Sequence, residues 1–128
     1  MLMDSGYDSY QQVDLDAQAA AANPHQLVVM LIDGLLDELT RIRGHIEAKR
    51  LEHKGLGINK CMNILVGLDS ALDLDNGGEI ADNLHQLYDY CQLELYQASV
   101  QNQTERLDNV EQVMSNIREG WLHFGQQA

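Results

Sequence analysis

A glycine pair at Gly77 and Gly78 separates two segments whose apolar residues recur at helical spacing. The first segment ends near Leu74 and the second begins at Ile80. Because glycine adopts positive φ without a Cβ penalty, one helix can end beside this pair and the next can begin at once, with Glu79 near its positive end. The pair therefore predicts a helical hairpin.

Apolar stripes predict four helices. The first spans about 24–49, the second ends at about 74, and the third and fourth span about 79–102 and 104–124. The steps of three and four residues within them are typical of packed antiparallel helices. The start of the second helix stays open, because Gly55 and Gly57 each weaken a helix. The four predicted core stripes are Val28, Ile32, Leu35, Leu39, Ile42 and Ile46; Ile58, Cys61, Leu65, Leu68 and Leu72; Ile80, Leu84, Leu87, Cys91, Leu95 and Ala98, flanked by Tyr88; and Leu107, Val110, Met114, Ile117, Trp121 and Phe124.

Capping signals mark two of the helix starts. Asn23-Pro24-His25-Gln26 supplies a cap side chain, a proline at the first helical position and a glutamine that can complete a capping box. Asn102 and Glu105 have the spacing of a second capping box, before the last helix.

The chain is predicted to be all-α, an antiparallel four-helix bundle that forms a single domain over residues 23–128. One proline and 5% aromatic residues leave little material for strands. Residues 1–22 lack a sustained apolar stripe and are predicted to form a mobile or short-helical N-terminal arm.

The formal net charge of −12, from 20 acidic and 8 basic side chains, repels phosphate backbones and anionic lipid surfaces. Nucleic acid is therefore not an expected partner. The sequence shows neither a leader pattern nor the roughly 20 apolar residues that cross a bilayer, so we expect a cytoplasmic protein without membrane insertion. Cys61 and Cys91 fall on inward faces, where we expect buried free thiols.

The sequence predicts no catalytic residue, metal site or cofactor, and therefore no enzyme. Di-metal bundles need paired Glu-x-x-His elements, and none occurs; Asp82-x-x-His85 is interpreted as polar surface. The histidines and cysteines lack zinc-site spacing. The Gly55–Lys60 run lacks the features of a phosphate loop, and the cysteines have apolar flanks that favour packing over nucleophilic chemistry.

Several apolar residues remain outside the predicted core stripes after projection at 100° per residue. Either they are scattered exposed side chains, which are normal on any protein, or they form a partner-binding groove that an arm bearing Tyr7 and Tyr10 covers when empty. Ala71 also lies away from the centre line of the predicted core stripe of the second helix. The candidate partner-binding residues are Tyr7, Tyr10, Leu27, Met30, Leu31, Ile64, Tyr90, Leu93 and Tyr96.

The sequence resembles the flagellin export chaperone family, FliS, over nearly its whole length. Three separated segments carry this resemblance, and their order and spacing together are specific. They are Tyr7-x-x-Tyr10-Gln11-Gln12; Asn23-Pro24-x-x-Leu27-Val28-x-Met30-Leu31-x-Asp33-Gly34; and Leu72-Asp73 leading through Gly77-Gly78-Glu79-Ile80-Ala81-x-Asn83-Leu84 to Leu87-Tyr88-x-Tyr90.

The resemblance implies a cytoplasmic chaperone that binds the C-terminal region of unassembled flagellin, prevents premature polymerisation and assists delivery to the flagellar type III export apparatus. Tyr7 and Tyr10 match arm residues that either cover the client groove or contact the export machinery. Two features depart from the family: Ile32, where an aromatic residue is common, and the Gly55/Gly57 stretch.

Two points stay open beside the resemblance. Gly34 either permits a close helix approach or is a tolerated helix glycine. The competing function is a self-associating structural or regulatory bundle whose spare apolar surface forms a homodimer.

Overall fold

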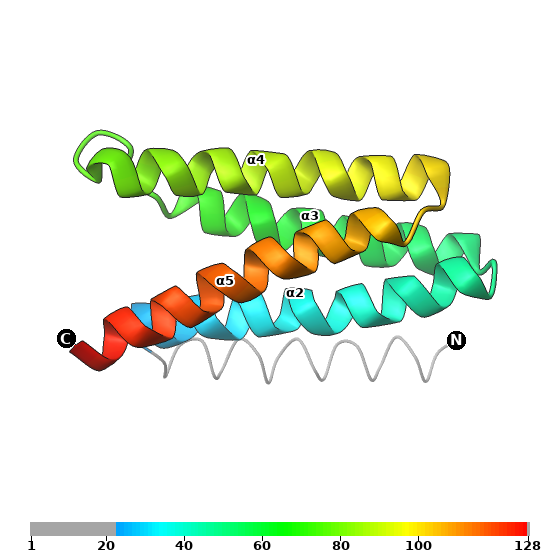
Figure 1. The fold of residues 1–128 in the computed structure, drawn as a ribbon, viewed down its shortest axis with the longest axis horizontal. Coiled ribbons are helices and arrows are strands. Elements are labelled where there is room, and N and C mark those ends of the chain that lie inside the picture. The colour runs from blue at the N-terminus through cyan, green and yellow to red at the C-terminus, as the bar shows by residue number, and fades with distance from the viewer. Residues whose placement is uncertain (1–22, 128) are drawn as a thin grey trace, which may run out of the picture.

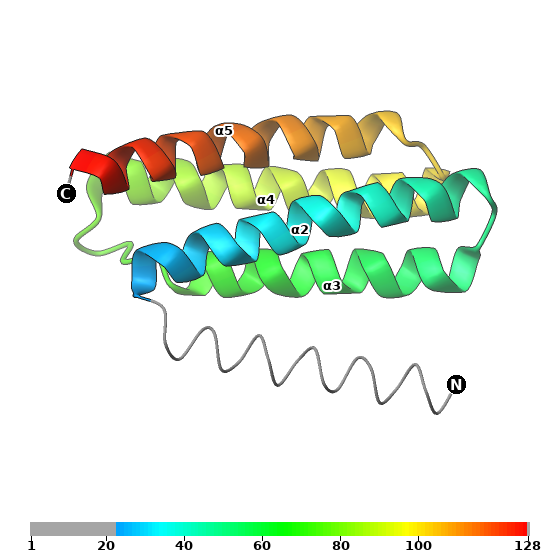
Figure 2. The ribbon, with the colours of Figure 1, turned by 90° about the horizontal axis from the view of Figure 1, so that it is seen from below.

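The computed structural model describes residues 23–127 and contains four helices and no strand within that range. Their bounds are α2 (Pro24–Glu47), α3 (Leu51–Ser70), α4 (Gly78–Gln101) and α5 (Glu105–Gln127). The helices run alternately in opposite directions, and each packs against two neighbours (Figures 1 and 2). The predicted all-α antiparallel four-helix bundle is confirmed, whereas the predicted arm over 1–22, with Tyr7 and Tyr10, lies outside the described residues.

The predicted start of α2 is confirmed in detail. The Asn23 side chain accepts a hydrogen bond from the Gln26 backbone N–H at 2.8 Å, and the Gln26 side chain accepts one from the Asn23 N–H at 3.4 Å. This reciprocal pair satisfies two N–H groups that a helix start otherwise leaves without partners, and Pro24 has no N–H to satisfy.

Two predicted helix features were wrong, the end of the second helix near Leu74 and the Asn102 cap of the last helix, and the start of the second helix is now defined. Helix α3 begins at Leu51 and ends at Ser70, so it contains both Gly55 and Gly57 and stops short of Leu74. Tertiary packing therefore overrides the low helix propensity of these glycines. Asn102 does not cap α5: it ends α4 in the left-handed conformation, with φ 52°.

The two glycines of the Gly77–Gly78 turn are required for different physical reasons. Gly78 has φ +62°, which favours glycine, whereas Gly77 has an ordinary negative φ of −80°. Gly77 is constrained by space, because a Cβ there would lie only 2.6 Å from the Cβ of Ala81. The connection over residues 71–77 thus packs closely on Ala81 at the start of α4.

The core follows the predicted stripes along most of the bundle. The fully buried large side chains are Ile32, Leu35, Leu39, Ile42, Leu65, Leu95, Leu107 and Met114. Val28, Leu72, Leu84 and Ile117 are partly buried against this core, and Tyr88 is 3% exposed. Burial of these side chains provides the main free energy that holds the helices together.

Three predicted core residues are exposed instead: Ile80 is 73%, Leu87 37% and Phe124 65% exposed. Figure 1 shows the reason, since α5 leans away from the start of α4 towards α2 at this end of the bundle. Trp121 is half-buried rather than fully buried, and it meets His25 in the first turn of α2. Helix α5 extends past the start of α2 (Figures 1 and 2), and Phe124 belongs to the last turn of α5.

The contact between His25 and Trp121 fastens the first turn of α2 to the C-terminal part of α5. His25 Nε2 lies 2.6 Å from the Trp121 carbonyl oxygen, and Trp121 Nε1 donates to the His25 carbonyl oxygen at 3.1 Å. The two rings stack with their centroids 5.4 Å apart. Because these bonds satisfy polar groups on both residues, they give a half-buried Trp a fixed position.

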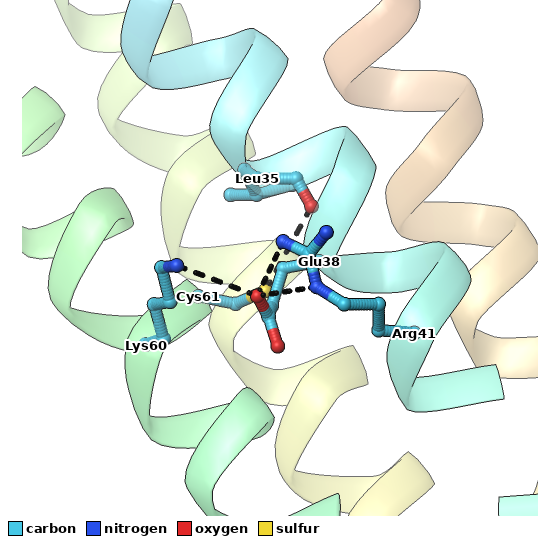
Figure 3. A network of polar contacts seen from close by, with 5 residues as sticks. All are labelled: Leu35, Glu38, Arg41, Lys60 and Cys61. Carbon is cyan, nitrogen blue, oxygen red and sulfur yellow. Dashed lines mark hydrogen bonds and ion pairs between the residues drawn. The ribbon is translucent and has the colours of Figure 1, made fainter. Parts of the chain in front are cut away.

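Helices α2 and α3 are also joined by a buried carboxylate, that of Glu38 (Figure 3). Its Oε2 lies 2.7 Å from Arg41 Nη2 and 3.5 Å from Lys60 Nζ. Beside it, Cys61 Sγ donates weakly to the Leu35 carbonyl oxygen at 3.9 Å. Because partners from both helices surround the carboxylate, it is not left as a lone buried charge.

Buried Lys54 joins α3 to the end of α4. Its Nζ donates to the Ser99 carbonyl oxygen at 2.8 Å and to Asn102 Oδ1 at 2.7 Å. These bonds satisfy a carbonyl that the α4 helix end leaves without an intrahelical partner, and the cation is favourable beside the negative end of the helix. On the opposite side of α4, buried Glu94 is paired with Arg106 of α5 at 3.3 Å.

The close contact between α2 and α3 lies at Gly57 rather than at Gly34. A Cβ at Gly57 would lie 2.7 Å from Ile42 Cγ1 and 2.9 Å from Glu38 Oε1. A Cβ at Gly34 would meet only Ile64 Cδ1, at an ordinary distance of 4.0 Å. Gly57 therefore permits the helices to approach, while Gly34 is a tolerated helix glycine.

Candidate partner-binding surface

The α4 helix presents a row of exposed apolar side chains on its outward side. Three of the predicted residues form it: Tyr90 is 41%, Leu93 57% and Tyr96 57% exposed. Val100, which was not among the predicted residues, is 61% exposed and lies seven residues after Leu93, on the same side of the helix. These four residues are here named the α4 ridge.

The remaining described candidates lie elsewhere. Leu27, Met30 and Leu31 on α2 and Ile64 on α3 are all half-buried, and Leu31 and Ile64 pack against the core. The 4.0 Å distance from Ile64 Cδ1 to the Cβ position of Gly34 places Ile64 at the boundary of α2 and α3. Their exposed apolar surface is therefore smaller than that of the α4 ridge.

The structure does not gather all the candidates into one groove. Helix α2 packs against α3 and α5, and α4 packs against the same two helices, so α2 and α4 lie at opposite corners of the bundle (Figure 2). The candidates on α2 are consequently separated from the α4 ridge by the width of α3. A phase on a helical wheel cannot reveal this separation, because it gives no information about which helices are neighbours.

A histidine with two carboxylate neighbours connects α3 and α4 near the glycine turn. His85 Nδ1 lies 2.7 Å from Asp69 Oδ1 of α3, and His85 Nε2 lies 3.5 Å from Asp89 Oδ2 of α4. The hydrogen bond that His85 donates to Asp69 is the largest cause that raises the pKa of His85 above its ordinary value of 6.5, and the charges of Asp69 and Asp89 add to it. The two carboxylates thus favour the protonated form of the imidazole.

The same three residues are the described side chains that could converge on a metal ion, since their ligand atoms lie within 4.8 Å of one another. Both ring nitrogens of His85 already face carboxylate oxygens from different sides. Hydrogen bonding and charge pairing therefore account for the arrangement without an ion.

The position of the His85 proton can be tested by NMR titration of the imidazole. We expect a pKa above 6.5 in the wild type and a return towards 6.5 in Asp69→Asn, with a smaller decrease in Asp89→Asn. Since the folded-state pKa is raised, the contribution to stability is complete below the unfolded value of about 6.5 and is lost as pH rises through the folded value. An unchanged pKa in Asp69→Asn would contradict this assignment.

The two thiols have no nucleophilic setting. Cys61 and Cys91 are free and fully buried. Burial raises the pKa of each thiol to about 12. Both therefore stay protonated at neutral pH and act as small apolar side chains.

No helix within residues 23–127 combines the length and the apolar character needed to cross a membrane.

Comparisons with known proteins identify the family. The family model described as "Flagellar protein FliS" matches residues 6–128. The chain is 41% identical over 112 residues to the flagellar secretion chaperone FliSB of Pseudomonas aeruginosa, covering 88% of this chain and 89% of that protein. It is 40% identical over 125 residues to the flagellar secretion chaperone FliS of Salmonella typhimurium, covering 97% and 93%.

A solved structure described as "Crystal structure of flagellar chaperone from bacteria" has the same fold. It superposes with a TM-score of 0.77 at 18% identity, covering 84% of this chain and 87% of that one. The relatives are named as chaperones, a role without catalysis. The chain belongs to the FliS family of flagellar secretion chaperones.

Proposed function

We propose that this protein binds the C-terminal region of unassembled flagellin through the α4 ridge, in the cytoplasm, and thereby prevents premature polymerisation. The observation that carries this proposal is the ridge itself, on a helix of a secretion chaperone. Delivery of the bound flagellin to the flagellar type III export apparatus belongs to the same proposal.

The chemistry of the ridge suits such a client. An amphipathic segment detached from its assembly has an apolar face that would otherwise self-associate, and an exposed helix side can cover that face as the segment folds. The ridge offers two tyrosines, Tyr90 and Tyr96, which combine a large apolar ring with a polar tip and are enriched at interfaces.

The other candidates have secondary places in the proposal. The half-buried residues Leu27, Met30, Leu31 and Ile64 would extend the contact around α3 only for a client that wraps past the ridge. Tyr7 and Tyr10, in the arm, would either cover the apolar surface in the free protein or contact the export machinery.

Calorimetric titration with a peptide from the C-terminal region of flagellin from the same bacterium tests the proposal. We expect saturable one-to-one binding with a negative change in heat capacity, because apolar surface is buried. Absence of binding by a folded protein, together with a stable dimer in sedimentation, would overturn it in favour of the self-associating bundle.

A further inference from the structure

The outward side of α4 changes character halfway along the helix. Residues seven apart in a helix lie nearly on one line, about 10.5 Å apart along the axis. Two such lines run along α4, and all of their members are exposed: Glu79, Gln86, Leu93 and Val100; and Asp82, Asp89 and Tyr96. Each line begins with acidic or amide side chains and ends with apolar ones.

Apart from histidine, the charged side chains between Lys60 and Arg106 are all acidic. No Lys or Arg occurs between Lys60 and Arg106, so α4 contains none. Two cations from neighbouring segments contact α4 and are already engaged, Lys54 at the carbonyl end of α4 and Arg106 on Glu94. They leave the carboxylates on the first half of α4 without a lysine or arginine partner on that helix.

The positive groups at this end of α4 do not cancel its carboxylates. Glu79, Asp82 and Asp89 on α4, together with Asp69 of α3, contribute four negative charges. Protonated His85 contributes one positive charge, and the helix start adds roughly half an elementary charge. The first half of the outward side therefore remains negative beside the apolar α4 ridge.

We propose that the outward side of α4 binds an amphipathic helix with basic residues in one half and an apolar stripe in the other. The basic half lies on Glu79, Asp82 and Asp89, and the apolar half covers the α4 ridge. This inference rests on the proposed function and specifies the charge of the client segment that the ridge receives.

A second copy of α4 does not fit the same surface. In a parallel pair the acidic halves would face each other, and in an antiparallel pair each acidic half would lie on the other copy's ridge. The first arrangement brings like charges together, and the second desolvates carboxylates against apolar side chains. A cationic partner avoids both costs.

Two synthetic amphipathic peptides test the charge of the partner against the full-length chain. They share a leucine stripe in one half and carry three lysines or three glutamates in the other half. Fluorescence anisotropy measures the dissociation constant of each peptide at about 50 mM and at about 500 mM NaCl. Between these salt concentrations the screening length falls from above 10 Å to a few Å. We expect the lysine peptide to bind about tenfold more tightly at low salt and this preference to shrink at high salt.

A matched pair of double variants locates the effect. Asp82→Asn/Asp89→Asn should weaken binding of the lysine peptide by about tenfold at low salt and leave the glutamate peptide unaffected or slightly tighter. The control Asp37→Asn/Glu47→Gln removes the same charge from exposed positions of α2, at the opposite corner of the bundle, and should change neither affinity by more than about twofold. Circular dichroism confirms that both variants fold.

Parallel titration with the flagellin C-terminal peptide separates the two proposals. If that peptide binds while the lysine and glutamate peptides bind equally, or while neither binds, the charge inference fails and the proposed function stands. If the flagellin peptide does not bind but the lysine peptide shows the expected preference, the proposed client is wrong and the surface is correctly described. An equal loss in both double variants would also overturn the inference.

Discussion

The Leu93→Asp variant is expected to bind the flagellin C-terminal peptide at least about thirtyfold more weakly than the wild type, which corresponds to about 2 kcal/mol for a residue at the centre of an interface. Leu93 lies in the middle of the α4 ridge and is 57% exposed. The new carboxylate is hydrated in the free protein but must lose water when the apolar face of the client covers it. Calorimetry gives the dissociation constant, and Tyr90→Asp should act in the same direction.

Leu56→Asp is the matched control for this prediction. Leu56 is 64% exposed, but it lies on α3 and not on the α4 ridge. The same change of side chain and charge is therefore made at a comparably exposed position. Equal binding by the Leu93→Asp variant and the wild type, or equal loss in both variants, would show that the ridge is not the contact. Unchanged helicity excludes unfolding as the cause of a loss.

Helical periodicity predicted which side of each helix is buried, but not how far along its neighbours each helix is covered. The stripe of α2 is buried from Ile32 to Ile46, where α3 and α5 pack against the helix, whereas Val28 near its start is only partly buried. Ile80 and Phe124 satisfy the same spacing rule and are exposed, because they lie where α5 leans away from α4 or extends past α2. Such end effects depend on helix crossing, which apolar spacing alone does not encode.

The candidate surface was also predictable only in part, because periodicity gives the phase of a residue on its own helix but does not say which helices lie beside it. The phase of Tyr90, Leu93 and Tyr96 predicted that they would lie off the core, and they are exposed. Val100 carries the same signal, seven residues after Leu93. The separation between the candidates on α2 and those on α4 required the arrangement of four helices, which no single stripe contains.

The buried charge of Lys54 was not predicted, because its partners are distant in sequence. Lys54 lies seven residues before Cys61, so spacing places it on the core side of α3. Its partners, Ser99 and Asn102, are 45 and 48 residues away, at the end of α4. Only the packing of α3 against α4 shows that this cation replaces the missing hydrogen bonds of a helix end.

The Gly57→Ala variant is expected to lower the free energy of unfolding by about 1–3 kcal/mol, the usual cost of an overfilled core. The added Cβ would lie 2.7 Å from Ile42 Cγ1, an atom within a fully buried side chain, and 2.9 Å from Glu38 Oε1. To relieve these contacts α3 must move away from α2, which loosens the packing of both. Urea unfolding followed by circular dichroism measures the change.

Gly67→Ala is the control on the same helix and should raise the free energy of unfolding by up to about 1 kcal/mol, since alanine favours a helix over glycine. Gly67 is exposed, and no atom lies within 4 Å of its Cβ position. Both variants gain the same intrinsic helix propensity, so the difference between them isolates the cost of the contact at Gly57. Equal stabilisation of both variants would show that α2 and α3 do not depend on a glycine at this crossing.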